Sequence, residues 1–331
     1  MTDTKKKEPV AEKKRGKKWL KILHLTAEIV CLILVVAVGV VAYNYILNRN
    51  FKEHFYQVSS GKVSGGLRVI QISDLHNSEF GDNNADLVER ITELKPDIIA
   101  MTGDIIEEDG NDVQTALKLC EQLVDIAPVY FVYGNHETIK SFGYNDMSLD
   151  EIDEILGCTE DNRSSEGFYT LEDELKTELE NIGVHVLWNE YETIQVGENQ
   201  IDIYGVLTCH PYAFWQYAGE AFSEFYDNNT DHFKLMLCHE PYIFETWKEN
   251  AWADLSLAGH THGGLLHIPY LGGLYEYRNG LFPECGNKGY YVYGKYDVNG
   301  YPLIVGNGLN NQELLRINNQ PELVIIDVNR Y

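Results

Sequence analysis

Two kinds of apolar run alternate along residues 67–133, and this alternation restricts the fold more than any other feature of the sequence. The order predicts a β-α-β-α-β unit whose parallel strands are joined by right-handed crossovers. The carboxyl ends of such strands share one edge of the sheet, so polar residues that follow them are expected to form a site there. Strand-like runs lie at residues 67–73, 97–102 and 129–133, and helix-like runs lie at residues 84–95 and 113–126.

The second half of the chain contains more strand-like runs. A helix is predicted over residues 171–183, with Gly183 as its C-cap. The polar, acidic residues 141–168 have weak periodicity and are expected to form an insertion over the edge of the sheet. Mixed strand pairing with helices outside predicts two stacked sheets. The further strand-like runs lie at residues 185–190, 192–197, 200–207, 234–240, 253–264, 301–308 and 322–328.

An apolar run without a charged side chain extends from Ile29 to Leu47. As a helix it would be about 28 Å long, which is close to the thickness of a bilayer core. The run therefore predicts a membrane-spanning helix near the N-terminus. The predicted organisation is a basic cytoplasmic tail (1–25), a transmembrane helix (26–47), a polar stalk (48–66) and one large domain (67–331).

The residues before this run determine its expected orientation. Residues 1–21 contain nine basic and three acidic side chains, and such an excess stays on the cytoplasmic side, so the domain is expected outside. A cleaved signal peptide is the competing interpretation, with Val40 and Ala42 as small residues before the cut. The anchor is favoured because the run is longer than an ordinary signal core, and because Tyr43 and Tyr45 suit a membrane interface.

The rest of the chain is strongly acidic. Without residues 1–21, 17 Lys and Arg remain against 48 Asp and Glu, which is a net charge of −31. This excess argues against binding of nucleic acid through its phosphates, and an anionic substrate would need a local positive charge. A metal centre would supply that charge.

Side chains that can bind metals follow five of the strand-like runs. Carboxylate and imidazole groups without a cysteine favour Mn, Fe or Zn over a structural thiolate zinc. Seven candidate ligands are too many for one ion, so we expect two divalent ions that share a bridging carboxylate. The candidates are Asp74, His76, Asp104, Asn135, His239, His260 and His262, and His136 lies beside them in the sequence.

Two pairs among these candidates have a spacing of two residues. Asp74 and His76 form one pair, and His260 and His262 form the other. In an extended segment, residues i and i+2 face the same way. The spacing therefore predicts that each pair points into one cavity.

The order of these motifs resembles that of the calcineurin-like metallophosphoesterase family, in its bacterial membrane-associated branch. The family pattern is D-x-H, GD, GNH-D/E, H and GH-x-H, and the resemblance runs from about Leu67 to the C-terminus. It implies a four-layer α-β-β-α fold and a dinuclear metal centre. The matching stretches are Asp74-Leu75-His76, Gly103-Asp104, Gly134-Asn135-His136-Glu137, His239 and Gly259-His260-Thr261-His262.

The resemblance also implies a role for each matching residue. A bridging hydroxide would attack phosphorus in line, and Asp104 would bridge the two metals. His136 is not a ligand in the family and would protonate the leaving oxygen. The implied ligand sets are Asp74, His76, Asp104 and His262 for one ion, and Asp104, Asn135, His239 and His260 for the other.

One stretch departs from the related protein phosphatases, which extend the second motif to GD-x-x-D-R-G. Here it reads GDIIEEDG, without an arginine, and this weakens a phosphoprotein assignment. Glu107 and Asp109 in this stretch either orient His136 or are solvated loop acids.

Two functions from different classes are compatible with the sequence. The first is a membrane-anchored phosphohydrolase acting on phosphodiesters, pyrophosphates or monoesters, with lipid or envelope compounds among the candidate substrates. The second is a membrane-tethered binding or scaffold domain that keeps the fold without turnover. The complete set of candidate ligands favours the enzyme, since a scaffold has no need to keep them.

Overall fold

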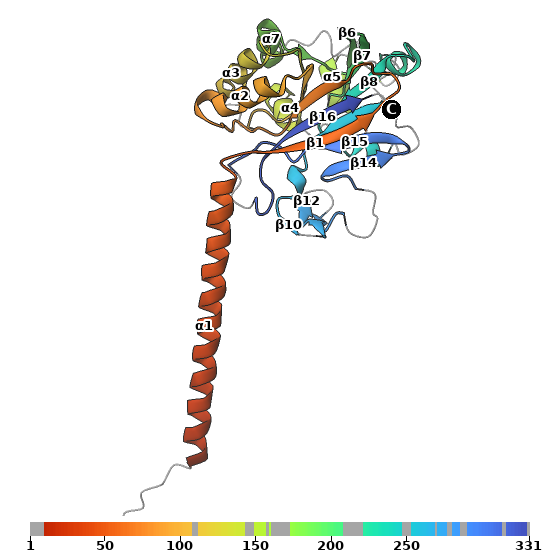
Figure 1. Cartoon of the computed structure of the whole chain (residues 1–331). Coiled ribbons are helices and arrows are strands. Elements are labelled where there is room, and N and C mark those ends of the chain that lie inside the picture. The colour runs from red at the N-terminus through yellow and green to blue at the C-terminus, as the bar shows by residue number, and fades with distance from the viewer. Residues whose placement is uncertain are drawn as a thin grey trace, which may run out of the picture.

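In the residues that the computed structural model describes, two six-stranded sheets form the body of the protein, and one long helix extends away from it (Figure 1). The predicted mixture of parallel and antiparallel pairing is confirmed. The described residues are 10–107, 112–142, 149–156, 159, 173–207, 221–246, 253–268, 270–276, 280–284, 290–312 and 316–329.

The first sheet contains the predicted β-α-β-α-β unit. Its strand order is β1-β16-β2-β3-β4-β5, and β2 to β5 are parallel. The strands are β1 (Lys52–Ser59), β16 (Glu322–Asn329), β2 (Leu67–Ile72), β3 (Ile98–Thr102), β4 (Val129–Val132) and β5 (His185–Val186). The helices on its outer face are α2 (Ala85–Leu94), α3 (Gln114–Leu123) and α7 (Glu174–Ile182), the last ending at Gly183 as predicted.

The second sheet has the order β14-β15-β9-β8-β7-β6. Strands β15, β9, β8 and β7 are parallel, and both edge strands are antiparallel to their neighbours. Helical residues 221–227 and α9 (Ile243–Thr246) contribute Phe222, Phe225 and Phe244 to its outer face. The strands are β14 (Gly294–Val298), β15 (Tyr301–Val305), β9 (Leu255–Ala258), β8 (Phe233–Leu237), β7 (Asn199–Gly205) and β6 (Glu190–Val196).

Three buried apolar clusters separate the layers. One lies between the helices and the first sheet, one between the two sheets, and one on the outer face of the second sheet. The continuous apolar runs of β3, β4 and β8 are buried on both faces, as expected for strands covered from both sides. The predicted α-β-β-α layering is therefore confirmed.

Several short elements complete the chain. The predicted insertion begins within α4 (Asn135–Phe142) and contains α5 (Leu149–Leu156), while much of its remainder lies outside the described residues. Two small hairpins join β10 (His267–Ile268) to β11 (Gly272–Gly273) and β12 (Tyr275–Glu276) to β13 (Gly280–Leu281). Single 3-10 turns are η1 (Asp82–Asn84) and η2 (His262–Gly264).

Part of the segment predicted as a stalk is a strand of the first sheet. β1 pairs in parallel with β16 from Lys52 opposite Glu322 to Ser59 opposite Asn329. Tyr56 and Val58 are buried, whereas the alternate residues are exposed. The polar residues on the exposed face conceal the strand in the sequence, so the domain begins before residue 67.

The N-terminal helix α1 (Val10–Leu47) starts well before the predicted boundary at residue 26. By length and composition, its residues Lys18–Leu47 could cross a membrane. Its last turn is attached to the body, because the Asn48 side chain donates to the carbonyl of Arg316 over 2.8 Å. The Asn318 amide donates to the Asn44 side chain over 2.8 Å.

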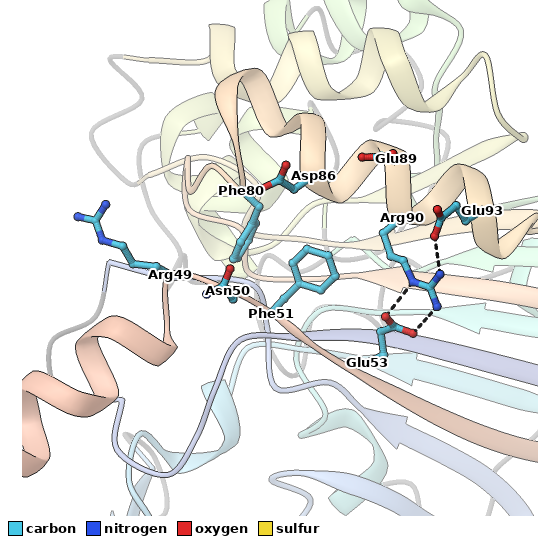
Figure 2. Close-up of a pocket in the computed structure, with 9 residues that line it drawn as sticks. All are labelled: Arg49, Asn50, Phe51, Glu53, Phe80, Asp86, Glu89, Arg90 and Glu93. Atoms are coloured by element: carbon cyan, nitrogen blue, oxygen red, sulfur yellow. Dashed lines mark hydrogen bonds and ion pairs between the residues drawn. The ribbon is translucent and has the colours of Figure 1, made fainter.

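The joint between α1 and the body also contains a pocket, shown in Figure 2. Phe51 packs edge-on against Phe80, with ring centroids 5.2 Å apart. Arg90 of α2 forms ion pairs with Glu53 of β1 and with Glu93 (Figure 2). Since Phe80 belongs to the loop that follows β2, the segment between α1 and β1 packs against a polar loop at that edge of the sheet.

Candidate metal centre

The structure brings all seven predicted ligands, together with His136, to one place between the sheets. They follow β2, β3 and β4 in the first sheet and β8 and β9 in the second. Backbone bonds tie the loops together, since the amide of Asp74 donates to the carbonyl of Gly103 over 3.0 Å. His239 reaches across from the second sheet, with Nδ1 2.8 Å from the Thr102 carbonyl.

Asp74, His76 and His262 form the first group of donors, with one donor atom from each within 4.8 Å of the others. The Nε2 atoms of His76 and His262 are 3.2 Å apart. His262 Nε2 is 3.5 Å from Asp74 Oδ1. Such a convergence of imidazole and carboxylate donors is suited to a divalent cation.

Asp104, His239 and His260 form the second group. The Thr102 carbonyl can only accept, so Nδ1 of His239 donates to it, and Nε2 is the nitrogen that faces the group. Asn135 adds an amide oxygen, which lies 3.1 Å from His239 Nε2 and 2.9 Å from His260 Nδ1. These four side chains match the second predicted ligand set.

Asp104 lies between the two groups and is almost completely buried. Its Oδ2 is 3.1 Å from His239 Nε2 and 3.8 Å from His76 Nε2. Its Oδ1 accepts the backbone amide of His136 over 2.9 Å. One carboxylate oxygen therefore faces imidazoles of both groups.

The backbone at these positions differs from the predicted extended geometry. Asp74 and His76 have φ of 49° and 47°, and His260 and His262 have φ of 73° and 47°. All four therefore lie in the left-handed region, which is strained for residues with a Cβ and is common at functional sites. The side chains of both pairs do reach the centre, but tight turns rather than extended segments orient them. His260 and His262 belong to different donor groups.

Glycines of the motifs make room for these carboxylates. A Cβ on Gly134 would lie 2.2 Å from Asp104 Oδ1, and a Cβ on Gly259 would lie 1.8 Å from Ser73 Oγ and 2.5 Å from Asp74 Oδ2. No real Cβ approaches an atom so closely. The glycines before Asn135 and His260 are therefore required by packing against the donor loops.

Gly259→Ala is expected to displace Asp74 and to lower metal affinity by about 10-fold or more, the range seen when the support of a ligand is lost. Titration of the purified variant with Mn²⁺ measures this loss. Gly61→Ala is the matched control, since a Cβ there meets no atom within 4 Å. Equal Mn²⁺ affinity in both variants would contradict the packing argument.

Glu137 is a structural part of the centre that the sequence did not reveal. It is fully buried in the first turn of α4 and accepts the backbone amides of Asp104, Ile105, Ile106 and Gly134 at 2.8–3.2 Å. These bonds join the loop after β3 to the start of α4. The only sequence signal was its place in the GNHE motif.

Glu107 lies beside the centre, but its carboxylate is not within ordinary hydrogen-bond distance of the histidines there. Its Oε2 is 3.9 Å from His136 Nδ1 and 3.8 Å from His76 Nδ1, which is longer than an ordinary hydrogen bond. Its side chain is 41% exposed. This geometry favours the solvated alternative for Glu107, and Asp109 lies outside the described residues.

The charges of the centre suit a cation. Burial opposes ionisation of Asp104, but attraction to His239 outweighs it and holds the pKa of Asp104 well below its usual range. Burial opposes protonation of His239, yet Asp104 raises the pKa of His239 to about 10. Burial keeps the pKa of His260 well below its usual range. The buried carboxylate of Asp104 and the neutral imidazole of His260 therefore belong to the same group, and both can bind a metal ion.

Comparison with known proteins gives consistent matches. A family model described as calcineurin-like phosphoesterase matches residues 67–264. Phosphodiesterase YaeI of Escherichia coli (strain K12) is 25% identical, over 79% of this chain and 82% of its own length. The uncharacterized metallophosphoesterase YkoQ of Bacillus subtilis (strain 168) is 25% identical, over 69% and 75% of the two chains.

Among solved structures, the NAD nucleotidase NadN of Haemophilus influenzae is similar to this chain with a TM-score of 0.43 and 15% identity. The match covers 74% of this chain and 45% of the other. The chain therefore spans less than half of that protein.

Proposed function

Because the chain belongs to the calcineurin-like phosphoesterase family, as its motifs predicted, we propose that it is a membrane-anchored, metal-dependent phosphohydrolase. It cleaves phosphodiester, pyrophosphate or phosphomonoester bonds. The observation that supports a two-metal centre best is the position of Asp104, whose Oδ2 faces both His239 and His76.

Two divalent cations, with Mn, Fe or Zn as candidates, fit the donors of the two groups. When bound, they would stabilise charge on the phosphoryl oxygens and acidify the attacking water. Asp104, as a shared ligand, would neutralise part of their charge. The proposed ligands are Asp74, His76, Asp104 and His262 for one ion, and Asp104, Asn135, His239 and His260 for the other.

His136 is proposed as the proton donor to the leaving oxygen. Its Nε2 lies 3.9 Å from Asp104 Oδ2, beside the centre, and its backbone is fixed by the bond to Asp104. Burial lowers the pKa of His136. The imidazolium of His136 is therefore a stronger acid than that of free histidine but is a minor form at neutral pH, so proton donation by His136 favours mildly acidic conditions.

We further propose that the domain lies outside the cytoplasmic membrane and acts on phosphate esters of lipid or envelope origin. The basic residues that precede the apolar run of α1 support this orientation. A pocket is lined by Tyr45 and Arg49 at the end of α1 and by Asn77 and Glu79 of the loop that carries His76. A substrate that leaves the membrane beside α1 would meet this pocket close to the centre.

Full-length protein purified in detergent tests the enzymatic function. Hydrolysis of bis(p-nitrophenyl) phosphate should be lost after chelation and restored by Mn²⁺. Ion binding without hydrolysis under Mn²⁺, Fe²⁺ or Zn²⁺ would instead indicate the non-catalytic scaffold.

His136→Ala should keep both metals and slow hydrolysis by about 10²- to 10⁴-fold, the usual effect of losing a general acid. Esters with poor leaving groups should slow most, because they depend on protonation. Rates for a series of phenyl phosphates, with metal content measured in parallel, check this. His185→Ala, which removes a half-exposed histidine on β5, should leave the series unchanged, and metal loss in His136→Ala would contradict the assigned role.

A further inference from the structure

The two hairpins β10–β11 and β12–β13 expose apolar side chains on the side of the body from which α1 extends (Figure 1). Tyr270 is fully exposed, and Leu271, Tyr275 and Leu281 are 44%, 42% and 62% exposed. We refer to these four residues as the hairpin surface. Exposed apolar side chains gathered on neighbouring hairpins mark an interaction surface.

The hairpin surface also differs in charge from the rest of this acidic protein. From Leu265 to Phe282 the sequence contains a single acid, Glu276. Its side chain is 3% exposed and accepts the Tyr242 hydroxyl over 2.6 Å. No exposed carboxylate of the described residues in this stretch would repel an anionic lipid headgroup.

Hydrogen bonds fix the level of the hairpins relative to α1. Asn318 donates its amide to Asn44, in the last turns of α1, and its side chain to the carbonyl of His267 over 3.2 Å. His267 donates in turn to the carbonyl of Ile317 over 3.0 Å. Asn44 belongs to the uncharged run that ends at Leu47. The start of β10 therefore lies level with the C-terminal end of the membrane-spanning segment.

We propose that the hairpin surface dips into the headgroup region of the bilayer that α1 crosses. This inference rests on the membrane anchoring in the proposed function. The tyrosines of the hairpin surface combine an apolar ring with a polar hydroxyl, which suits the membrane–water interface. Its leucines suit the boundary between the headgroups and the acyl chains. The protein would then contact lipid at two places, α1 and the hairpins.

This contact places the metal centre at the membrane surface. Gly264 of η2 lies directly against Gly273 of β11, and the space between them is too small for a Cβ atom. The Asn319 side chain donates to the carbonyl of His262 over 2.7 Å. Hairpins held by lipid would therefore hold the loop of His262 close to phosphate esters of the same membrane.

The test uses the full-length chain in vesicles of phosphatidylcholine and phosphatidylglycerol. An environment-sensitive fluorophore is attached at Leu271→Cys, at Leu281→Cys and at the control Glu174→Cys, which is exposed on α7 at the opposite end of the body (Figure 1). Unmutated protein, treated identically, corrects for the native cysteines. Nitroxide lipids labelled near the headgroup should quench most of the emission at Leu271→Cys and Leu281→Cys, and little at Glu174→Cys.

The outcomes separate this inference from the function on which it rests. The protein could float with the vesicles while the labels at Leu271→Cys and Leu281→Cys are quenched no more than the label at Glu174→Cys. That result would overturn the hairpin contact and leave the anchor intact. Failure of the unmutated chain to float with the vesicles would overturn the anchor. Hydrolysis of a soluble ester is measured separately, so loss of activity does not affect either result.

Discussion

Asp104→Asn should empty the metal centre and abolish hydrolysis together. The substitution keeps the shape of the side chain, and asparagine tolerates the left-handed φ of 53° at this position. It removes the charge that raises the pKa of His239 and the oxygen that faces both donor groups. Since losing a mere supporting partner of a ligand costs 10- to 100-fold in affinity, we expect a fall of more than about 100-fold here.

Metal content after dialysis and kcat/KM with bis(p-nitrophenyl) phosphate are the two measurements. Asp82→Asn is the matched control, because Asp82 is an exposed acid in η1, and it should change neither. If Asp104→Asn retained two ions while losing activity, Asp104 would act in the chemistry rather than as a bridge. If it lost neither, the proposed centre would be wrong.

Most of the candidate centre could be predicted because its residues follow strands that bury easily recognised apolar runs. The continuous runs of β2, β3 and β8 placed Asp74, Asp104 and His239 at strand ends. Local dihedral angles were not predictable in the same way. The spacing of Asp74 and His76 suggested an extended segment, whereas tertiary packing holds both in the left-handed region.

The elements that the sequence did not predict depend on distant partners. β1 has only two buried apolar positions, Tyr56 and Val58, and gains its order by pairing with the C-terminal strand β16. The hairpins around Gly272 and Gly280 are too short to show periodicity. Non-local pairing of this kind leaves little local signal. The aromatic stretch at residues 210–226 could from its sequence be buried core, an apolar wall for a lipid-bearing substrate or a surface that meets the membrane; residues 210–220 lie outside the described residues, and Phe222 and Phe225 are buried.

Glu137→Gln should destabilise the metal-free protein as well as the centre. One carboxylate oxygen accepts the amides of Asp104 and Gly134, and the other accepts those of Ile105 and Ile106. Glutamine offers a single oxygen, so two buried N–H groups would face its NH₂ group. Each unsatisfied group costs about 1–3 kcal/mol, and the Tm of the metal-free chain should fall by roughly 5 °C or more.

Thermal unfolding with a chelator present isolates this effect, because no bound metal then contributes to stability. Glu121→Gln, an exposed position on α3, should leave the Tm unchanged. A Tm for Glu137→Gln equal to that of the control would mean that the loop after β3 and the start of α4 do not depend on this carboxylate. A large fall together with weaker Mn²⁺ binding would show that Glu137 supports Asp104 through the backbone, since Glu137 belongs to neither proposed ligand set.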